Sequence, residues 1–195
     1  MSESSLHTSA VRLLTDWRAP TAEQDSLRHT YLAFLAAAPD GCLRRSAPGH
    51  LTASAIVFDA SRRHVLLTLH PRVGRWIQLG GHAEPDDASL PDAARREARE
   101  ESGIDDLELD NPDLNAGIVH VHTHPITCSL GVPTRHLDVR FAVVAAPTAD
   151  GALPTIRRSD ESDDLQWWPV DALPEDAGDD IATLIDAALA RPGRD

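Results

Sequence analysis

The sequence has little cysteine and no long apolar run. Only two cysteines occur in 195 residues, Cys42 and Cys128, too few for a disulfide framework, so we expect both to be reduced thiols. No apolar run approaches the roughly 20 residues that span a bilayer, and the first residues lack the basic-then-apolar pattern of a signal peptide. We therefore expect a cytoplasmic protein with no membrane association.

Basic charge is also scarce. The chain carries 18 basic and 31 acidic residues, a net charge of −13. A chain this acidic is a poor general binder of nucleic acid or anionic membrane, and no helix-turn-helix or basic segment is evident. We expect no nucleic-acid partner. A phosphate-bearing substrate would need local positive charge, supplied by a metal ion and a few arginines.

The length suits one core with appendages. Before residue 50, Thr21 and Gln24 form a possible capping box, and apolar residues then recur at helical spacing up to Pro39. This segment could cover the core, line a dimer contact or shape a substrate pocket. We divide the chain into an N-terminal helical extension (1–49), one main domain (50–190) and a tail (191–195).

The main domain alternates strand-like and helical patterns. A helix is expected after Ser89 and another over 177–190. Strands are expected over 51–58, 64–70, 76–79, 107–109, 117–126, 136–146 and 165–168. Helices before, between and after mixed strands predict an α/β fold, an α/β/α sandwich around a mixed β-sheet.

The most informative segment is the helix that Ser89 would cap and Gly103 would end. Glu97, Glu100 and Glu101 lie near its C-terminal end, where the helix dipole favours cations, and they fall within an arc of roughly 100°. Like charges at this spacing repel by roughly 0.2–0.5 kcal/mol per pair. The cluster therefore indicates oxygen ligands for a hard divalent cation. The alternative is a solvated acidic face.

Residues 81–104 resemble the signature of the Nudix hydrolases. That signature reads Gly, five residues, Glu, seven residues, Arg-Glu, an apolar residue, any residue, Glu-Glu, any residue, Gly and an apolar residue. The segment 96–104 matches every fixed position of the second half. Gly81 and Asp87 match the first half, with Asp in place of Glu, and eight residues instead of seven precede Arg96. We expect the loop before the helix to absorb the extra residue.

The resemblance implies a Nudix-like sandwich and a Mg²⁺ or Mn²⁺ cofactor. The implied metal ligands are Glu97, Glu100, Glu101 and the backbone carbonyl of Gly81, with Arg96 orienting a glutamate through charge-assisted hydrogen bonds. It implies that water cleaves a diphosphate bond in a nucleoside diphosphate derivative, after the metal lowers the pKa of that water from about 15.7 toward 7. A homodimer is also typical of the family.

Further site residues come from the same resemblance. In relatives, a glutamate in the loop before the last strand sometimes acts as base or touches a metal, and Glu161 is the matching position. The alternative is an ordinary solvated loop glutamate. His136, Asp138 and Arg140 alternate onto one strand face, so His136 and Arg140 are candidate substrate-binding residues. The alternative is that this face is an ordinary ion-paired sheet edge. Glu84 is a possible outer metal ligand.

Three more histidines, His120, His122 and His124, share one face of the preceding strand. Three histidines on one face can hold a transition metal. A substrate-facing or solvated row is the favoured interpretation, because no thiolate or carboxylate partner lies at metal-ligand spacing.

Two other functions remain open on this fold. Prenyl diphosphate isomerases resemble this chain around Trp76 but carry a catalytic cysteine where this chain has Gly80, which argues against isomerisation. Modules that sense nucleotides without cleaving them typically lose the signature glutamates, and here all three are present. Hydrolysis is therefore the favoured function, and a nucleotide-sensing binding module is the alternative.

Overall fold

The computed structural model describes residues 3–114, 117–127, 131 and 133–191. Cys128 and most of the predicted tail lie outside these residues. The helices are α1 (Glu3–Asp16), α2 (Ala22–Ala37), α3 (Leu90–Ser102) and α4 (Ile181–Leu189). The strands are β1 (His50–Phe58), β2 (His64–His70), β3 (Arg75–Ile77), β4 (Leu79–His82), β5 (Leu107–Leu109), β6 (Ile118–Thr127), β7 (Pro133–Ala145) and β8 (Asp164–Pro169).

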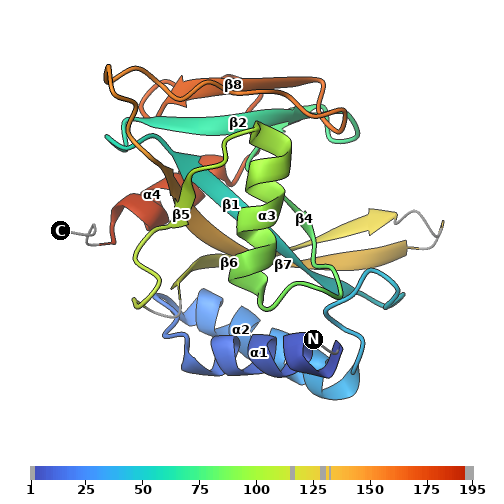
Figure 1. Ribbon diagram of the computed structural model, residues 1–195. Coiled ribbons are helices and arrows are strands. Elements are labelled where there is room, and N and C mark those ends of the chain that lie inside the picture. The colour runs from blue at the N-terminus through green and yellow to red at the C-terminus, as the bar shows by residue number, and fades with distance from the viewer. Residues whose placement is uncertain (1–2, 115–116, 128–130, 132, 192–195) are drawn as a thin grey trace.

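Strand β1 is the centre of a curved, mixed, eight-stranded sheet (Figure 1). Along one edge it runs parallel to β7, with His50 opposite His136 and Phe58 opposite Val144. Along its other edge it pairs antiparallel with β4 at residues 52–55 and with β2 at its last residues. Strands β6 and β5 extend the sheet from β7, and β3 and β8 pair with β2.

Side chains of β1 alternate between two hydrophobic clusters. Ala55 and Val57 pack in a cluster that includes buried residues of α1, α2 and α3. Ile56 and Phe58 face the opposite side, where the cluster includes Ile181 and its neighbours on α4. Every residue of β1 is buried, as expected for a central strand covered on both faces. Helices on both sides of a mixed sheet confirm the predicted α/β/α sandwich.

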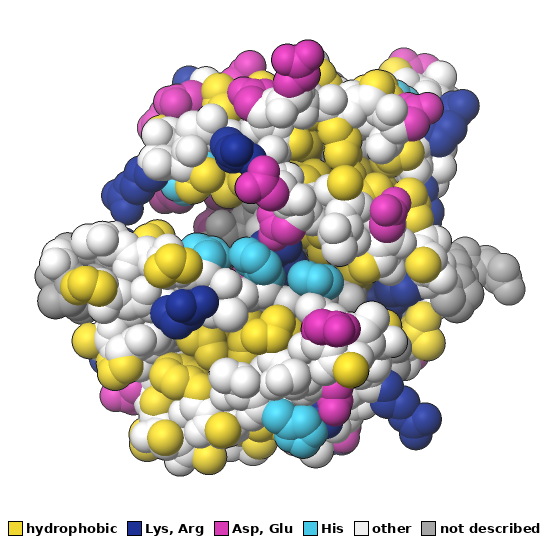
Figure 2. Space-filling view, turned by 180° about the vertical axis from the view of Figure 1, so that it is seen from behind, with side chains coloured by type: hydrophobic (Ala, Val, Ile, Leu, Met, Phe, Trp, Pro, Cys, Tyr) yellow, Lys and Arg dark blue, Asp and Glu magenta, His cyan; other side chains and the backbone are white. Residues whose placement is uncertain are grey.

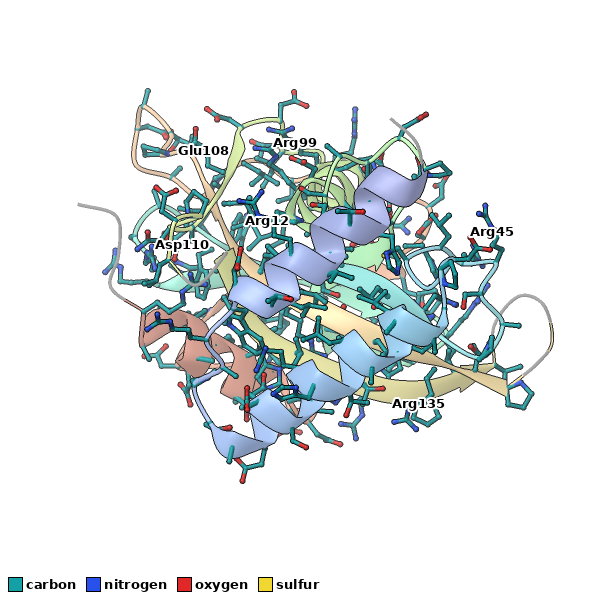
Figure 3. All side chains as sticks on the ribbon, turned by 90° about the horizontal axis from the view of Figure 1, so that it is seen from below. Arg12, Arg45, Arg99, Glu108, Asp110 and Arg135 are labelled. Atoms are coloured by element: carbon teal, nitrogen blue, oxygen red, sulfur yellow. The ribbon has the colours of Figure 1, made fainter. Side chains whose placement is uncertain are left out.

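Helices α1 and α2 lie side by side across the sheet (Figure 3). Helix α2 begins as predicted, with the Thr21 side chain accepting a hydrogen bond from the Gln24 N–H. The Gln24 amide then makes two bonds to Val121 of β6, accepting from its N–H at 2.8 Å and donating to its carbonyl at 3.0 Å. Tyr31 donates to the His122 carbonyl at 2.6 Å. The extension therefore covers the core; the division at residues 49 and 190 stays a prediction.

Cys42 is a buried free thiol just after α2. Burial raises its pKa to about 12, which leaves no thiolate at neutral pH. None of the helices in the described segments has both the length and the apolar composition that a membrane span requires.

Candidate active site

Local sequence sets the position of α3. Ser89 accepts a hydrogen bond from the Asp92 N–H at 3.3 Å, and Gly103 ends the helix with φ +69° while its N–H donates to the Arg99 carbonyl. The predicted cap and stop are therefore correct. Ala94 and Ala98 on the inner face of α3 are fully buried. The glutamates are carried along the edge of the helix that faces β4.

Arg96 organises the acidic residues of α3. Its Nε and Nη2 donate to the two oxygens of Asp87, at 3.1 and 3.0 Å. Its Nη1 donates to Glu97 Oε1 and to Glu100 Oε2, each at 3.0 Å, and its Nη2 also donates to the His82 carbonyl. Such bidentate, charge-assisted bonds hold a side chain firmly. The aspartate at the variant signature position thus anchors the arginine that positions two glutamates.

The two glycines of β4, Gly80 and Gly81, bring backbone against two carboxylates of α3. Gly80 has φ +140°, and a Cβ there would lie 2.5 Å from Ser54 Cα, so only glycine fits. Its N–H donates to Glu101 Oε2 at 3.1 Å. A Cβ on Gly81 would lie 2.7 Å from Glu97 Oε2. The missing side chain of Gly81 therefore makes room for Glu97, and the missing side chain of Gly80 lets β4 approach β1 closely.

The buried glutamates resist ionisation. Burial raises the pKa of Glu97 to about 7, although the Arg96 charge opposes the rise. Burial likewise raises the pKa of Glu101 to about 8, against the hydrogen bond from Gly80, and repulsion from Glu100 and Glu161 adds to both rises. Carboxylates provide the hard oxygen donors that a divalent cation prefers. The residues present fit Mg²⁺ or Mn²⁺.

A cavity of about 530 Å³ opens beside α3, a size typical of small-molecule sites. It brings Glu161, from the loop before β8, together with the signature residues Arg96, Glu97, Glu100, Glu101 and Gly81. Further lining residues are Leu43, Arg44, Arg45, His82, Ala83, Glu84, Pro85 and Ser159. Glu161 and Glu84 both line this cavity, and their roles stay predictions.

Sequence reasoning missed Arg44 and Arg45, because they fall in the segment assigned to the helical extension. Both reach the cavity from the loop after α2, where Arg45 is labelled in Figure 3. Arg45 pairs with Asp40 at 2.9 Å, while Arg44 has no acidic partner among the described residues. Adjacent arginines occur at four places in the sequence, so no local signal distinguished this pair.

Arg140 lies in a different environment. Its side chain is 3% exposed, its Nε donates to Asp138 at 2.8 Å, and its Nη1 pairs with Asp180. Arg140 is therefore an ion-paired residue of the sheet, which was one of the two alternatives that the sequence left open. Its role in substrate binding stays a prediction. His136, predicted with it, contacts the rings of His50 and His82, and the latter lines the cavity.

The row of His120, His122 and His124 is partly paired with protein groups. His120 Nε2 lies 3.1 Å from the Gln24 amide, and His122 Nδ1 lies 3.1 Å from Arg140 Nη2. His124 stacks on His122 with ring centroids 5.7 Å apart. Within the described part of the chain these three rings do not form a metal-ligating group.

Comparison with known proteins places this fold and site in a family. The sequence profile of the NUDIX domain matches residues 48–187, and the chain belongs to the Nudix hydrolase family. It is 30% identical over 138 residues to the 8-oxo-dGDP phosphatase NUDT18 of Danio rerio, covering 69% of this chain but only 37% of that relative. This chain therefore spans well under half of that relative's length.

Solved structures agree on the fold. A Nudix family hydrolase from Clostridium perfringens superposes with a TM-score of 0.53 at 23% identity, over 70% of this chain and 96% of that one. The dihydroneopterin triphosphate pyrophosphohydrolase of E. coli gives a TM-score of 0.52 at 18% identity, over 70% and 92%. At these identities the likeness is one of fold alone.

Proposed function

We propose that this protein hydrolyses a diphosphate bond in a nucleoside diphosphate derivative, with Mg²⁺ or Mn²⁺ as cofactor. The proposal rests on one observation: Glu101 is buried and Glu97 is half-buried against the two glycines of β4, at the wall of a cavity, and both have raised pKa values. A folded protein tolerates such a like-charge cluster when a cation is bound there.

Each residue then has a chemical task. Glu97, Glu100, Glu101 and the Gly81 carbonyl would hold the ion, which when bound neutralises diphosphate charge and acidifies the attacking water. Arg96 keeps Glu97 and Glu100 in place by its 3.0 Å bonds to each.

Substrate groups would be held from the other cavity walls. Arg44 and Arg45 are placed to contact phosphate oxygens, because they supply positive charge at the mouth of an acidic cavity. His136 and Arg140 remain proposed substrate contacts. His136 would contact the substrate as part of the group of histidines beside the cavity. A homodimer also remains a proposal.

The direct test is a substrate panel assayed with Mg²⁺ and with EDTA. It should include 8-oxo-dGDP, after the activity named for the Danio rerio relative, together with sugar nucleotides, dinucleoside polyphosphates and oxidised nucleoside triphosphates. We expect metal-dependent release of phosphate-containing products from at least one compound. If none is cleaved, while nucleotides still bind in calorimetry, the chain is a sensing module and hydrolysis is wrong.

Glu161 is proposed to accept the proton of the attacking water. Glu161→Gln is expected to lower kcat by about 10²-fold with little change in KM, because general-base catalysis contributes about 10²–10⁴-fold. Steady-state kinetics on the substrate identified above would measure it. Asp160→Asn is the matched control, since it removes a charge from the same exposed loop. Equal kinetics for Glu161→Gln and Asp160→Asn would reject the role of Glu161.

A further inference from the structure

Three histidines from three strands meet next to the glutamate cavity. His50 begins β1, His82 ends β4 and His136 lies on β7. One nitrogen from each ring lies within 4.8 Å of the others, and the ring centroids are 5.0–5.1 Å apart. None of the three has a carboxylate partner among the hydrogen bonds and ion pairs of the described residues.

Sheet register explains why these residues converge. His50 is directly opposite His136 in the parallel β1–β7 pair, and His136 is opposite His124 in the antiparallel β6–β7 pair. His82 ends β4 on the other edge of β1, opposite Thr52. Imidazoles therefore form a band across four neighbouring strands. Figure 2 shows histidine side chains in a row along a hollow of the molecule.

We propose that His50, His82 and His136 form a binding site for a transition metal ion such as Zn²⁺, separate from the glutamate site. Imidazole nitrogen is a preferred ligand of Zn²⁺, and three histidines with one open position are a known type of zinc site. The open position would face the cavity, because His82 lines it.

The orientation of His50 supports this proposal. Its Nδ1 lies 3.2 Å from the Ser46 carbonyl, which can only accept, so Nδ1 carries the proton and Nε2 presents a lone pair. A backbone carbonyl that orients the ring in this way is the usual outer partner of a metal-bound histidine. His50 Nε2 accepts a hydrogen bond from His82 Nε2 at 3.1 Å. A metal ion would replace the proton between the two rings, because two nitrogens at about 2.0–2.1 Å from a tetrahedral zinc lie about 3.3 Å apart.

The remaining ring completes the donor set. His136 Nε2 is buried and has no hydrogen-bond partner in the described segments, although buried polar atoms usually have one. Arg44 is near enough to oppose a cation, but one screened charge is small beside three coordination bonds.

Cobalt titration of the full chain tests the site without any assay of turnover. Co²⁺ replaces Zn²⁺ and absorbs visible light strongly in a tetrahedral site, and excess Mg²⁺ would occupy the glutamates. We expect one equivalent of Co²⁺ to bind with a tetrahedral spectrum and to be displaced by Zn²⁺. Absence of that spectrum would overturn the proposal, whatever the hydrolase assay gives.

Variants assign the signal to residues. His82→Ala and His136→Ala are expected to weaken Co²⁺ binding by at least about 10–100-fold. His29→Ala, an exposed histidine on α2, and Glu100→Gln should leave it unchanged. Thermal melting checks that each variant is folded. If His136→Ala does not fold, His82→Gln provides the second variant of the site. Unchanged binding in folded His82 variants, or equal loss in Glu100→Gln, would place the ion elsewhere and reject the site.

Discussion

Glu100→Gln is expected to abolish metal-dependent hydrolysis, a loss of about 10³-fold or more, without unfolding the protein. Removing one group that stabilises charge in the transition state typically costs about 10²–10³-fold, and here weaker binding of the metal ion would add to that cost. The side chain of Glu100 is 59% exposed, so the free energy of unfolding should change by less than about 0.5 kcal/mol. Kinetics on the substrate from the panel and chemical denaturation measure the two effects.

Glu101→Gln should separate activity from stability more sharply. Gln keeps an oxygen that can accept from the Gly80 N–H, which now bonds Glu101 at 3.1 Å, but removes a carboxyl group whose burial opposes its ionisation. In EDTA we expect a gain in stability of about 0.5–2 kcal/mol together with lost turnover, as is common when strain at a functional site is relieved. Glu175→Gln, an exposed acid away from the cavity, controls for net charge. Retained turnover in both Glu100→Gln and Glu101→Gln would refute the proposed metal site.

The second large effect is expected at the buried pair of Asp138 and Arg140. Asp138 is 2% exposed and its Oδ1 also accepts from the hydroxyls of Thr52 and Ser54, at 2.9 and 2.7 Å. Asp138→Asn or Arg140→Met alone should each lower the free energy of unfolding by about 2–4 kcal/mol, because each breaks a buried ion pair. Arg140 would keep its contact with Asp180, and Asp138 would keep its two hydroxyl donors. The double variant should cost clearly less than the sum. Urea denaturation at pH 7 would measure all four proteins.

A surface pair gives the matched control. Arg12 and Asp16 on α1 lie 3.7 Å apart with side chains 84% and 62% exposed, so Arg12→Met should cost less than about 1 kcal/mol. Additive losses at Asp138 and Arg140, or losses as small as that of Arg12→Met, would show that the buried pair contributes little to stability.

The same pair predicts a pH dependence. Burial would raise the pKa of Asp138, but the adjacent Arg140 and two hydroxyl donors outweigh it and hold the pKa below its usual value. Its contribution is therefore complete above the unfolded pKa of about 3.9 and is lost as the pH falls through the lower folded value. Below about pH 4, Asp138→Asn should show a flatter stability profile than the parent.

Features encoded by neighbouring residues were predictable. The cap, acidic stripe and glycine stop of α3 follow from residues within one helix, and so their positions were correct. The segment 76–79 was predicted as one strand, but the chain changes partners near Gln78: β3 pairs with β2, and β4 pairs with β1. Helix α4 begins at Ile181 rather than at Ala177, because the Gly178 N–H donates to the Trp76 carbonyl at 2.8 Å.

Features that depend on long-range register were not predictable. His50 and His136 are far apart in sequence and meet only through the parallel pairing of β1 with β7, which no turn motif announces. Arg44 reaches the cavity because the loop after α2 folds back toward β4, another distant contact. The burial of Arg140 was unpredictable for the same reason, because it depends on an ion pair with Asp180, which directly precedes α4.

Helices α1 and α2 cannot be removed from the chain without exposing its core. Leu6, Leu14 and Tyr31 belong to one cluster with Leu51 of the central strand, so the boundary drawn at residue 49 passes through a shared interior. A fragment that starts at residue 50 would expose to water the apolar face of the sheet that these two helices now cover. It would also lose the Gln24 amide, whose two hydrogen bonds to Val121 hold β6 in place. Strand β6 carries three histidines.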